Sequence, residues 1–347
     1  MKKIILISFA AVAFSLSAPA QATNSPIELK VVLKDLMAKL PGEYDNEPQR
    51  FFEEEYKTPK DQQHQRVYRA FTRIDAPDVG DNVIVATVHS GSKDAAFDQS
   101  EFQVWTLQVD EPRKVVRMSP RKFKDPAKYT PIATDAAKLK GLLASELIPA
   151  KGAAGCDILW RLNGRQILGR TEPGMCNANL ARLQVDATFN WEWLLNDEEL
   201  WITFDGRDSS GKLVMGRPDQ TYWRLGKARN FECFLTYRPK GGEAQVNNGF
   251  IMHDRGGIYR TELKKGKASQ PVFIELIRGM WPSNSGRNYL DLLRMQVYEG
   301  KPEDDPKTWK LIGNATGSAE TDRAGFTSQD LSGRCKLRDP TAPPPKT

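Results

Sequence analysis

The segment Gly155–Cys176, GCDILWRLNGRQILGRTEPGMC, predicts a β-hairpin and constrains the fold more than any other part of the chain. Asn163-Gly164 at its centre is the dipeptide most typical of a two-residue type I′ turn, which needs positive φ at both central positions. Pairing outward from this turn places Trp160 opposite Ile167 and predicts one mostly apolar face. That face consists of Ile158, Trp160, Leu162 and Ile167, with Gly169 leaving room for a close neighbour. Taken alone, the pattern indicates a core hairpin in an antiparallel sheet.

The chain has four cysteines, which allow three disulfide connectivities: Cys156, Cys176, Cys233 and Cys335. A turn at Glu172–Met175, with Pro and Gly where a type II turn needs them, sends Cys176 back toward Cys156. For an exported protein we therefore favour the pairs Cys156–Cys176 and Cys233–Cys335. The alternative is a free Cys176 thiolate that holds a ligand.

The N-terminus has the features of a secretory signal peptide, which we assign to residues 1–22. Lys2 and Lys3 precede an apolar run from Ile4 to Leu16, and Ala20-Gln21-Ala22 fits an A-x-A cleavage site. This run is too short to span a bilayer, and no later segment approaches ~20 uninterrupted apolar residues. We therefore expect a periplasmic or secreted protein without an integral membrane segment.

The rest of the chain predicts a mainly β fold with an N-terminal helix, and we assign residues 25–227 to a first domain. Apolar residues recur at helical spacing until Pro41-Gly42 ends the helix: Leu29, Val32, Leu33, Leu36 and Leu40. From residue 63 onward apolar residues alternate, which predicts a series of short strands. We expect one further helix over Thr134–Leu147. A helix followed by many short antiparallel strands indicates a barrel or a sandwich.

A second, small β-rich module is expected over residues 228–338, with a disordered proline-rich tail over residues 339–347. The boundary lies where the composition changes, at residues 226–230. The strand-like runs of this module are residues 231–237, 250–253, 258–263, 272–277, 292–298 and 309–312.

Charge and motif content argue against several classes of function. The formal net charge is +6, but Lys and Arg are scattered among nearly as many acids, so we expect no nucleic-acid partner. The loop Asp205–Gly211 is rich in aspartate, but it lacks the EF-hand spacing and is better interpreted as a polar hairpin turn. None of the three histidines has the spacing of a metal site: His64, His89 and His253.

The hairpin also carries a family resemblance. Gly155-Cys156-Asp157, the Asn-Gly turn and Gly169-x-Thr171-x-Pro173-Gly174-x-Cys176 resemble the signature hairpin of the CpcT/CpeT chromophore lyase family. Upstream, Asn46 followed by Gln49 resembles the helix-exit motif of that family. The strand Arg66-Val67-Tyr68 and the acidic loop Asp205–Asp208 fall in the expected order. The resemblance covers roughly Leu29 to Leu225.

Three positions depart from the pattern of the family. Asp205-Gly206-Arg207 stands where the family has Asp-Arg-Gly, Met215-Gly216 where it has Trp-Gly, and Gln220-Thr221 where it has Gly-Pro. The acceptors of this family are phycobiliproteins, which are intracellular. The export signal expected here would place this chain in a different compartment from such acceptors. We therefore expect the barrel architecture of the family more firmly than its lyase activity.

The resemblance implies a calycin-like or lipocalin-like antiparallel β-barrel that holds an open-chain tetrapyrrole (a bilin) and attaches it to a cysteine of a phycobiliprotein. Such a ligand has two propionates, which arginine pairs with, and a flat conjugated body, on which Tyr or Trp stacks. The candidate ligand-binding residues are Arg66, Tyr68, Trp160, Arg161, Tyr222 and Trp223, and Cys176 would be the catalytic thiolate. The competing interpretation of each is a core aromatic or a solvated arginine.

Three hypotheses follow, from different classes of function. The first is a bilin chromophore lyase, which would bind a linear tetrapyrrole and pass it to an acceptor protein. The second is a non-catalytic periplasmic lipocalin-like carrier of a small molecule. The third is a structural envelope protein whose barrel is filled by side chains. None of them requires a cofactor beyond the bound tetrapyrrole, and a homodimer is left open.

Overall fold

We describe a computed structural model that covers residues 26–93, 102–133, 135–149, 155–180, 183–266, 268–283, 285–301 and 308–339. The expected signal peptide and the tail after Asp339 lie outside these residues. Of the described residues, 56% lie in strands and 12% in helices, so the fold is mainly β, as the sequence predicts. Among the described residues, no helix is long and apolar enough to cross a membrane.

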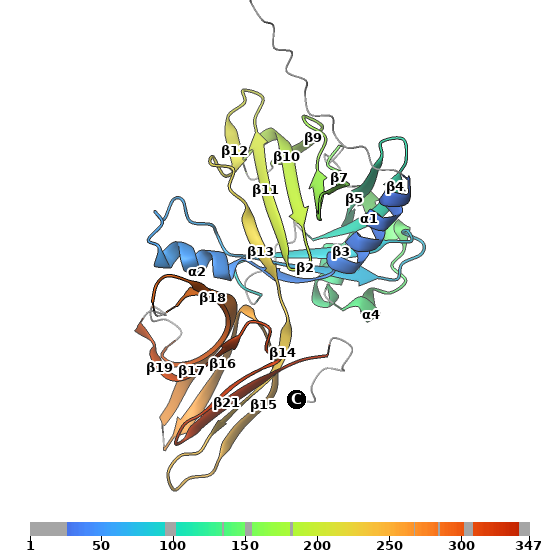
Figure 1. The fold of residues 1–347 in the computed structure, drawn as a ribbon. Helices are drawn as coiled ribbons and strands as arrows, with labels where there is room; N and C mark the ends of the chain where they lie inside the picture. The colour runs from blue at the N-terminus through green and yellow to red at the C-terminus, as the bar shows by residue number, and fades with distance from the viewer. Residues whose placement is uncertain are drawn as a thin grey trace, which may run out of the picture.

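Ten antiparallel strands form a closed barrel (Figure 1). Each strand pairs with the next around the ring, and the pairing of β10 with β11 closes it. Three short strands extend the sheet: β6 (Leu147–Pro149), β9 (Cys176–Leu180) and β12 (Leu213–Gly216). Around the ring the ten strands are β11 (Glu199–Arg207), β13 (Trp223–Lys227), β1 (Gly42–Asp45), β2 (Val67–Ile74), β3 (Val83–Ser90), β4 (Gln103–Asp110), β5 (Val115–Phe123), β7 (Ile158–Asn163), β8 (Gln166–Arg170) and β10 (Val185–Leu195).

Helix α1 (Pro26–Lys39) packs across one end of the barrel and confirms the predicted amphipathic helix. Val32 and Leu36 on its apolar side are buried in the same cluster as Tyr44 and Phe71 of the barrel wall. Tyr44 Oη donates a hydrogen bond to Lys39 O at 2.8 Å, which fixes the C-terminal end of the helix to β1. Burial of the apolar stripe, rather than helix propensity, therefore holds α1 in place.

The β7–β8 hairpin has the predicted faces but not the predicted pairing. The turn centres on Gly164-Arg165, with Gly164 at φ +63°, rather than on Asn163-Gly164. Trp160 therefore lies opposite Gly169 instead of Ile167. Because the register differs by two residues, every side chain stays on its predicted face. The neighbours for which Gly169 leaves room are Ile158 and Trp160, since a Cβ at this glycine would lie 2.6 Å from Ile158 Cγ2 and 2.7 Å from the indole ring.

The helix predicted over Thr134–Leu147 is wrong. The chain makes only separate short turns here, because Gly141 adopts φ +73° and its N–H bonds to Asp75 O instead of a helical carbonyl. The short helical segments of this region are α3 (Pro126–Tyr129), η2 (Thr130–Ile132), α4 (Ala136–Leu139) and η3 (Ala144–Glu146).

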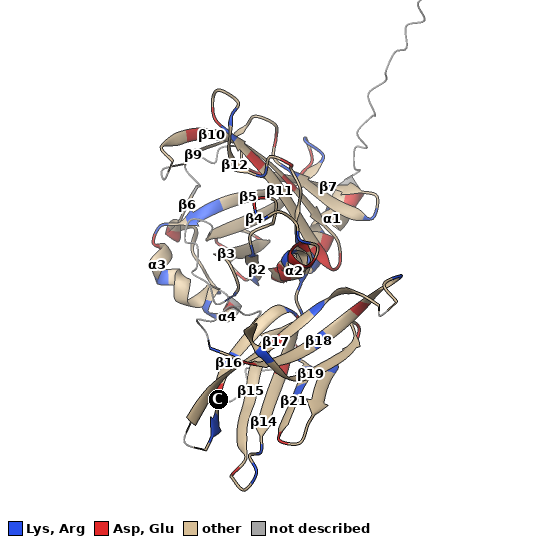
Figure 2. Ribbon diagram, turned by 90° about the vertical axis from the view of Figure 1, so that its left-hand side faces the viewer, with Lys and Arg blue, Asp and Glu red and all other residues tan. Residues whose placement is uncertain are grey.

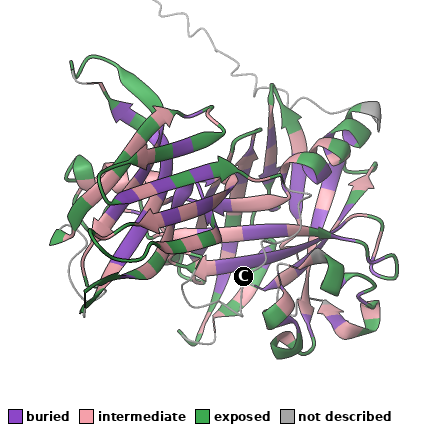
Figure 3. Cartoon of the chain, turned by 90° about the horizontal axis from the view of Figure 1, so that it is seen from below, coloured by how far each residue is buried: buried purple, intermediate pink, exposed green. Residues whose placement is uncertain are grey.

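The second unit is a β-sandwich of two four-stranded sheets, which lies below the barrel in Figure 1. The side chains between the two sheets form one apolar cluster that includes Phe231, Ile274 and Met295. Figure 3 shows the resulting buried residues along the strands of both units. The six runs predicted from the sequence each overlap one of the strands β14 to β19, whereas β20 and β21 were not predicted. The first sheet has the order β15 (Gln245–His253), β14 (Asn230–Tyr237), β21 (Leu331–Leu337) and β20 (Arg323–Thr327), and the second has the order β16 (Arg255–Lys265), β17 (Ala268–Pro282), β18 (Tyr289–Glu299) and β19 (Lys310–Ser318).

Each unit contains one disulfide, and both favoured pairings are confirmed. Cys156–Cys176 joins the start of the β7–β8 hairpin to β9. Cys233–Cys335 joins the neighbouring strands β14 and β21 inside the sandwich. Two disulfides indicate an oxidising, extracytoplasmic compartment.

Helix α2 (Glu47–Glu55), which the sequence did not predict, lies between the barrel and the sandwich (Figures 1 and 2). The rings of Phe51 and Phe52 lie 6.0 and 5.8 Å from the indole of Trp281 on β17. The chain itself passes from the barrel to the sandwich between Lys227 and Asn230. We call the region in which α2 contacts the sandwich, around Phe51, Phe52 and Trp281, the junction. Independent folding of residues 25–227 stays a prediction.

Candidate functional site

The inner face of the barrel carries a row of stacked aromatic side chains, which we call the aromatic wall: Phe189 and Trp191 of β10, Phe204 of β11 and Trp223 of β13. The rings of Trp191 and Phe204 are stacked with centroids 4.4 Å apart, and those of Phe204 and Trp223 are stacked at 5.5 Å. Trp191 pairs directly with Phe204 across the two strands. Because strand side chains alternate, residues at every second position along β10 share this inner face.

Exposure distinguishes the two levels of the barrel interior. Trp160 and Trp193 are 0% and 3% exposed and belong to the apolar cluster that α1 covers. Trp191, Phe204 and Trp223 are only half-buried although they face inward. Part of each of these three rings is therefore accessible to solvent, whereas Trp160 and Trp193 are sealed.

Polar groups also face this interior. The guanidinium of Arg69, on β2, lies 5.7 Å from the ring centroid of Trp193. Within the described part of the chain, the buried indole nitrogens of Trp160, Trp193 and Trp223 have no hydrogen-bond partner. A guanidinium is a donor and a cation, so Arg69 suits a ligand that carries acceptor oxygens or carboxylates.

The structure does not bring the six sequence-predicted ligand residues together. Trp160 and Trp223 lie on the inner face of the barrel. Tyr68 lies on the outer face of β2, where its ring is 5.3 Å from His89 and 5.9 Å from His253 of the sandwich. Arg161 lies on the outer face of β7, because its neighbour Trp160 occupies the inner one.

Tyr222 precedes the inward-facing Trp223 and points the other way. Its hydroxyl is hydrogen-bonded to Glu192 Oε1, on the outer face of β10. Burial, followed by the hydrogen bond to Glu192, raises the pKa of Tyr222 to about 12. Its ring lies 5.9 Å from that of Trp201. Tyr222 thus belongs to the outer surface of the barrel.

Arg66 lies at the junction rather than in the barrel. Its guanidinium donates to Asp45 Oδ2 and to Gly256 O of the sandwich, both at 2.8 Å, and lies 3.2 Å from Glu47. Burial raises the pKa of Asp45 to about 6, although Arg66 acts in the opposite direction. The donors of Arg66 are therefore committed to the protein, and it is not placed to pair with a ligand in the barrel.

Cys176 is half of the Cys156–Cys176 disulfide and is buried. It lies near the aromatic wall, in a small apolar cluster with Ala187 and Phe189. A nucleophilic role for its thiolate would require prior reduction of the disulfide. The turn before it, at residues 172–175, has the predicted form, with Met175 N bonded to Glu172 O and Gly174 at φ +75°.

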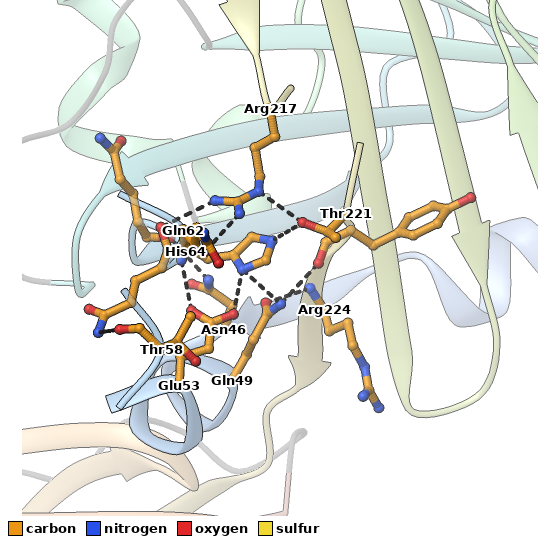
Figure 4. Close-up of polar contacts among 12 residues, drawn as sticks. Asn46, Gln49, Glu53, Thr58, Gln62, His64, Arg217, Thr221 and Arg224 are labelled. Atoms are coloured by element: carbon orange, nitrogen blue, oxygen red, sulfur yellow. Dashed lines mark hydrogen bonds and ion pairs between the residues drawn. The ribbon is translucent and has the colours of Figure 1, made fainter. Parts of the chain in front are cut away.

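A buried histidine lies beside the aromatic wall, and sequence reasoning missed it (Figure 4). His64 is 6% exposed, and its ring meets that of Trp223 edge-on at 5.4 Å. Its Nδ1 lies 2.5 Å from Glu53 Oε1 of α2, and its Nε2 lies 3.2 Å from Thr221 Oγ1. A carboxylate, an imidazole and a hydroxyl in this order form the arrangement in which enzymes activate a hydroxyl as a nucleophile.

The hydroxyl of Thr221 is nevertheless committed to other partners. It donates to Asp219 Oδ1 at 3.0 Å and accepts from Arg217 Nε at 2.9 Å. Arg217 also donates to the carbonyls of Gln62 and Gln63. These bonds join the loop after α2 to the loop before β13, so we interpret the group as a structural clasp at the rim of the barrel.

The Asn46 and Gln49 pair, which resembles a family motif, has a similar structural role at the start of α2. Asn46 Oδ1 accepts from Val67 N at 2.7 Å, at the start of β2. Gln49 Nε2 donates to Tyr222 O at 3.0 Å, and its Oε1 accepts from Arg224 N at 2.9 Å. Together they fix α2 to β2 and β13.

The loop predicted as a polar turn joins β11 to β12. Asp208 Oδ1 accepts from the backbone N–H groups of Ser210 and Lys212, and these bonds shape the turn. No group of three or more His, Cys, Asp or Glu in the described ranges could hold a metal ion.

The fold and the aromatic wall define a closed antiparallel barrel with an inward-facing aromatic surface and an attached sandwich. No family model matches the sequence, and a comparison with curated proteins finds no significant match. Among solved structures, the chain is similar to the CRL protein of Arabidopsis, with a TM-score of 0.42 and 15% identity. That match covers 58% of this chain and 97% of the other. The fold class rests on the strand pairing described above.

Proposed function

We propose that this protein is an extracytoplasmic carrier that binds a flat, conjugated, carboxylate-bearing ligand on the inner face of its barrel, with a linear tetrapyrrole as the leading candidate. The observation that carries the proposal is the half-buried aromatic wall, with Arg69 over the ring of Trp193, whose centroid lies 6.5 Å from that of Trp191. The stacked rings of Trp191, Phe204 and Trp223 offer faces for a conjugated body. Arg69 offers a charge for a carboxylate.

The carrier is favoured over a CpcT/CpeT-type lyase because of the disulfide at Cys176. A lyase that relays its chromophore through this thiol needs it free, whereas a carrier uses only the barrel. An exported carrier also needs no phycobiliprotein as an acceptor. The location, periplasmic or secreted, follows from the expected signal peptide and the two disulfides.

The test is titration of the protein with biliverdin, followed by the red absorption band of the bilin. Replacing Arg69 by Met removes a charge-assisted contact worth about 1.5–3 kcal/mol, so the affinity is expected to fall about 10- to 100-fold. Arg161→Met is the matched control, because Arg161 lies on the outer face and its loss should leave the affinity unchanged.

Two results would overturn the proposal. No spectral change with the wild type, even at a large excess of biliverdin, would exclude bilin binding and favour a barrel filled by its own side chains. An equal loss of affinity in Arg69→Met and Arg161→Met would mean that the ligand does not occupy the inner face.

A further inference from the structure

Helix α1 has a second stripe of side chains, beside the buried one, that lines a groove on the outside of the barrel. The buried stripe, which includes Val32 and Leu36, packs against the barrel core. Arg73 and Asn82 form the opposite wall of the groove, which has a volume of about 460 Å³. We call this feature the α1 groove. The second stripe recurs at helical spacing and consists of Lys30, Leu33, Lys34, Met37 and Ala38.

The opposite wall of the α1 groove is fixed by the barrel sheet. Arg73 lies near the end of β2, where it pairs with Ile84 of β3. The backbone carbonyl of Asn82 accepts a hydrogen bond from Leu107 N at 2.9 Å, and its Nδ2 donates to Leu107 O at 3.4 Å. One wall is thus a regular helix and the other belongs to paired strands, so the groove is already formed before any ligand binds.

The α1 groove is positively charged. Among the residues that the structure describes, three cations and no carboxylate line it, and none of Lys30, Lys34 and Arg73 forms an ion pair. Lys39 on the same helix, by contrast, lies 3.0 Å from Asp197 Oδ1. Lys30 and Lys34 are one helical turn apart, about 5–6 Å between their Cβ atoms, so their charges repel each other. A bound anion would relieve this repulsion.

The apolar part of the lining lies below the charged part. Met37 is 6% exposed and Leu33 is half-buried, whereas the three cations are exposed. A flat membrane surface would meet the cations but not these recessed side chains. A small polar anion would leave the apolar floor uncovered. A single acyl chain with an anionic head group matches both parts, because the chain covers the floor while the head group meets the cations.

We propose that the α1 groove binds one monomeric fatty acid, with the acyl chain on the apolar floor and the carboxylate among the three cations. Lys30 and Ala38 are about 12 Å apart along the helix axis, so the stripe offers a continuous track to a chain of medium length, such as that of decanoate. None of the lining residues belongs to the aromatic wall. This second site is therefore independent of the proposed carrier function of the barrel interior.

Isothermal titration calorimetry of the full-length protein with monomeric decanoate tests the proposal. Decanoate is expected to bind, and its affinity should fall as the salt concentration rises, because the cations are exposed. Decanol has the same chain without the carboxylate, and acetate has the carboxylate without the chain. Both are expected to bind more weakly than decanoate, since each lacks one of the two matched parts.

Substitutions identify the residues responsible. Lys30→Gln, Lys34→Gln and Arg73→Gln should each lower the affinity for decanoate about 3- to 5-fold, and the triple variant about 30- to 100-fold. Ala38→Trp fills the groove from its exposed edge without removing a charge and should also block binding, so the test survives if the triple variant folds poorly. Lys240→Gln, at an exposed lysine of the sandwich, is the matched control and should bind decanoate as the wild type does.

Three results would overturn the proposal. The first is the absence of decanoate binding to the wild type, including the case in which the protein instead sediments with phosphatidylglycerol vesicles and Lys34→Gln prevents this. The second is an affinity for decanoate that both the triple variant and Ala38→Trp retain in full. The third is loss of decanoate binding in Arg69→Met but not in the triple variant, which would place the fatty acid inside the barrel.

Discussion

We expect removal of the two disulfides to lower the free energy of unfolding by different amounts. Cys156 and Cys176 are 20 residues apart in the sequence, and Cys233 and Cys335 are 102 apart. On the chain-entropy account, loops of these sizes stabilise the folded state by about 3.3 and about 4.7 kcal/mol. We therefore expect the Cys233→Ala/Cys335→Ala variant to lose about 1.4 kcal/mol more than the Cys156→Ala/Cys176→Ala variant.

Packing acts in the same direction. Cys233 and Cys335 are 0% and 1% exposed in the core of the sandwich, so their truncation also removes buried contacts. Cys156 is half-buried and loses less. Denaturant titration at fixed pH, followed by far-ultraviolet circular dichroism, gives the free energy of unfolding for each variant. The reasoning would be refuted if the Cys156–Cys176 pair proved the more stabilising of the two, or if neither removal cost more than about 1 kcal/mol.

Three further predictions concern the core and the junction. Gly169→Val should lower the free energy of unfolding by about 1–3 kcal/mol, because the new side chain overlaps Trp160; an unchanged melting curve would show that the indole can move away. Arg66→Met should cost about 3–5 kcal/mol, because it leaves the buried Asp45 unpaired; a loss below about 1 kcal/mol would contradict this. A fragment that ends at Lys227 should unfold cooperatively on its own, as calorimetry would show; a fragment without a cooperative melt would mean that the barrel depends on the sandwich.

The fold could be predicted from the sequence where local patterns are strong. The faces of the β7–β8 hairpin follow from alternation, and they survived the wrong turn assignment because a shift of two residues preserves each face. The helix over Thr134–Leu147 failed because apolar spacing says nothing of Gly141, whose positive φ interrupts the helix. β20 was missed because Arg323–Thr327 is short and its alternation is weak.

The site was less predictable. Tyr222 and Trp223 are neighbours, so alternation alone indicates that only one of them can face into the barrel. The series Phe189, Trp191 and Trp193 was visible as an alternating strand, and it marks the inner face that the structure confirms. The role of Arg66 could not be found this way, because its partner Gly256 lies in the other unit, far away in the sequence.

The most direct test of the central claim is the visible circular dichroism of biliverdin in the presence of the protein. A bilin held against the chiral inner wall should acquire an induced band, and Trp191→Leu combined with Phe204→Leu should abolish it. Trp201→Leu is the control, because this indole lies on the outer face and donates to Glu199. The account predicts a band in the wild type and in Trp201→Leu but none in the double variant. No induced band in the wild type, or a band that the double variant keeps, would contradict it.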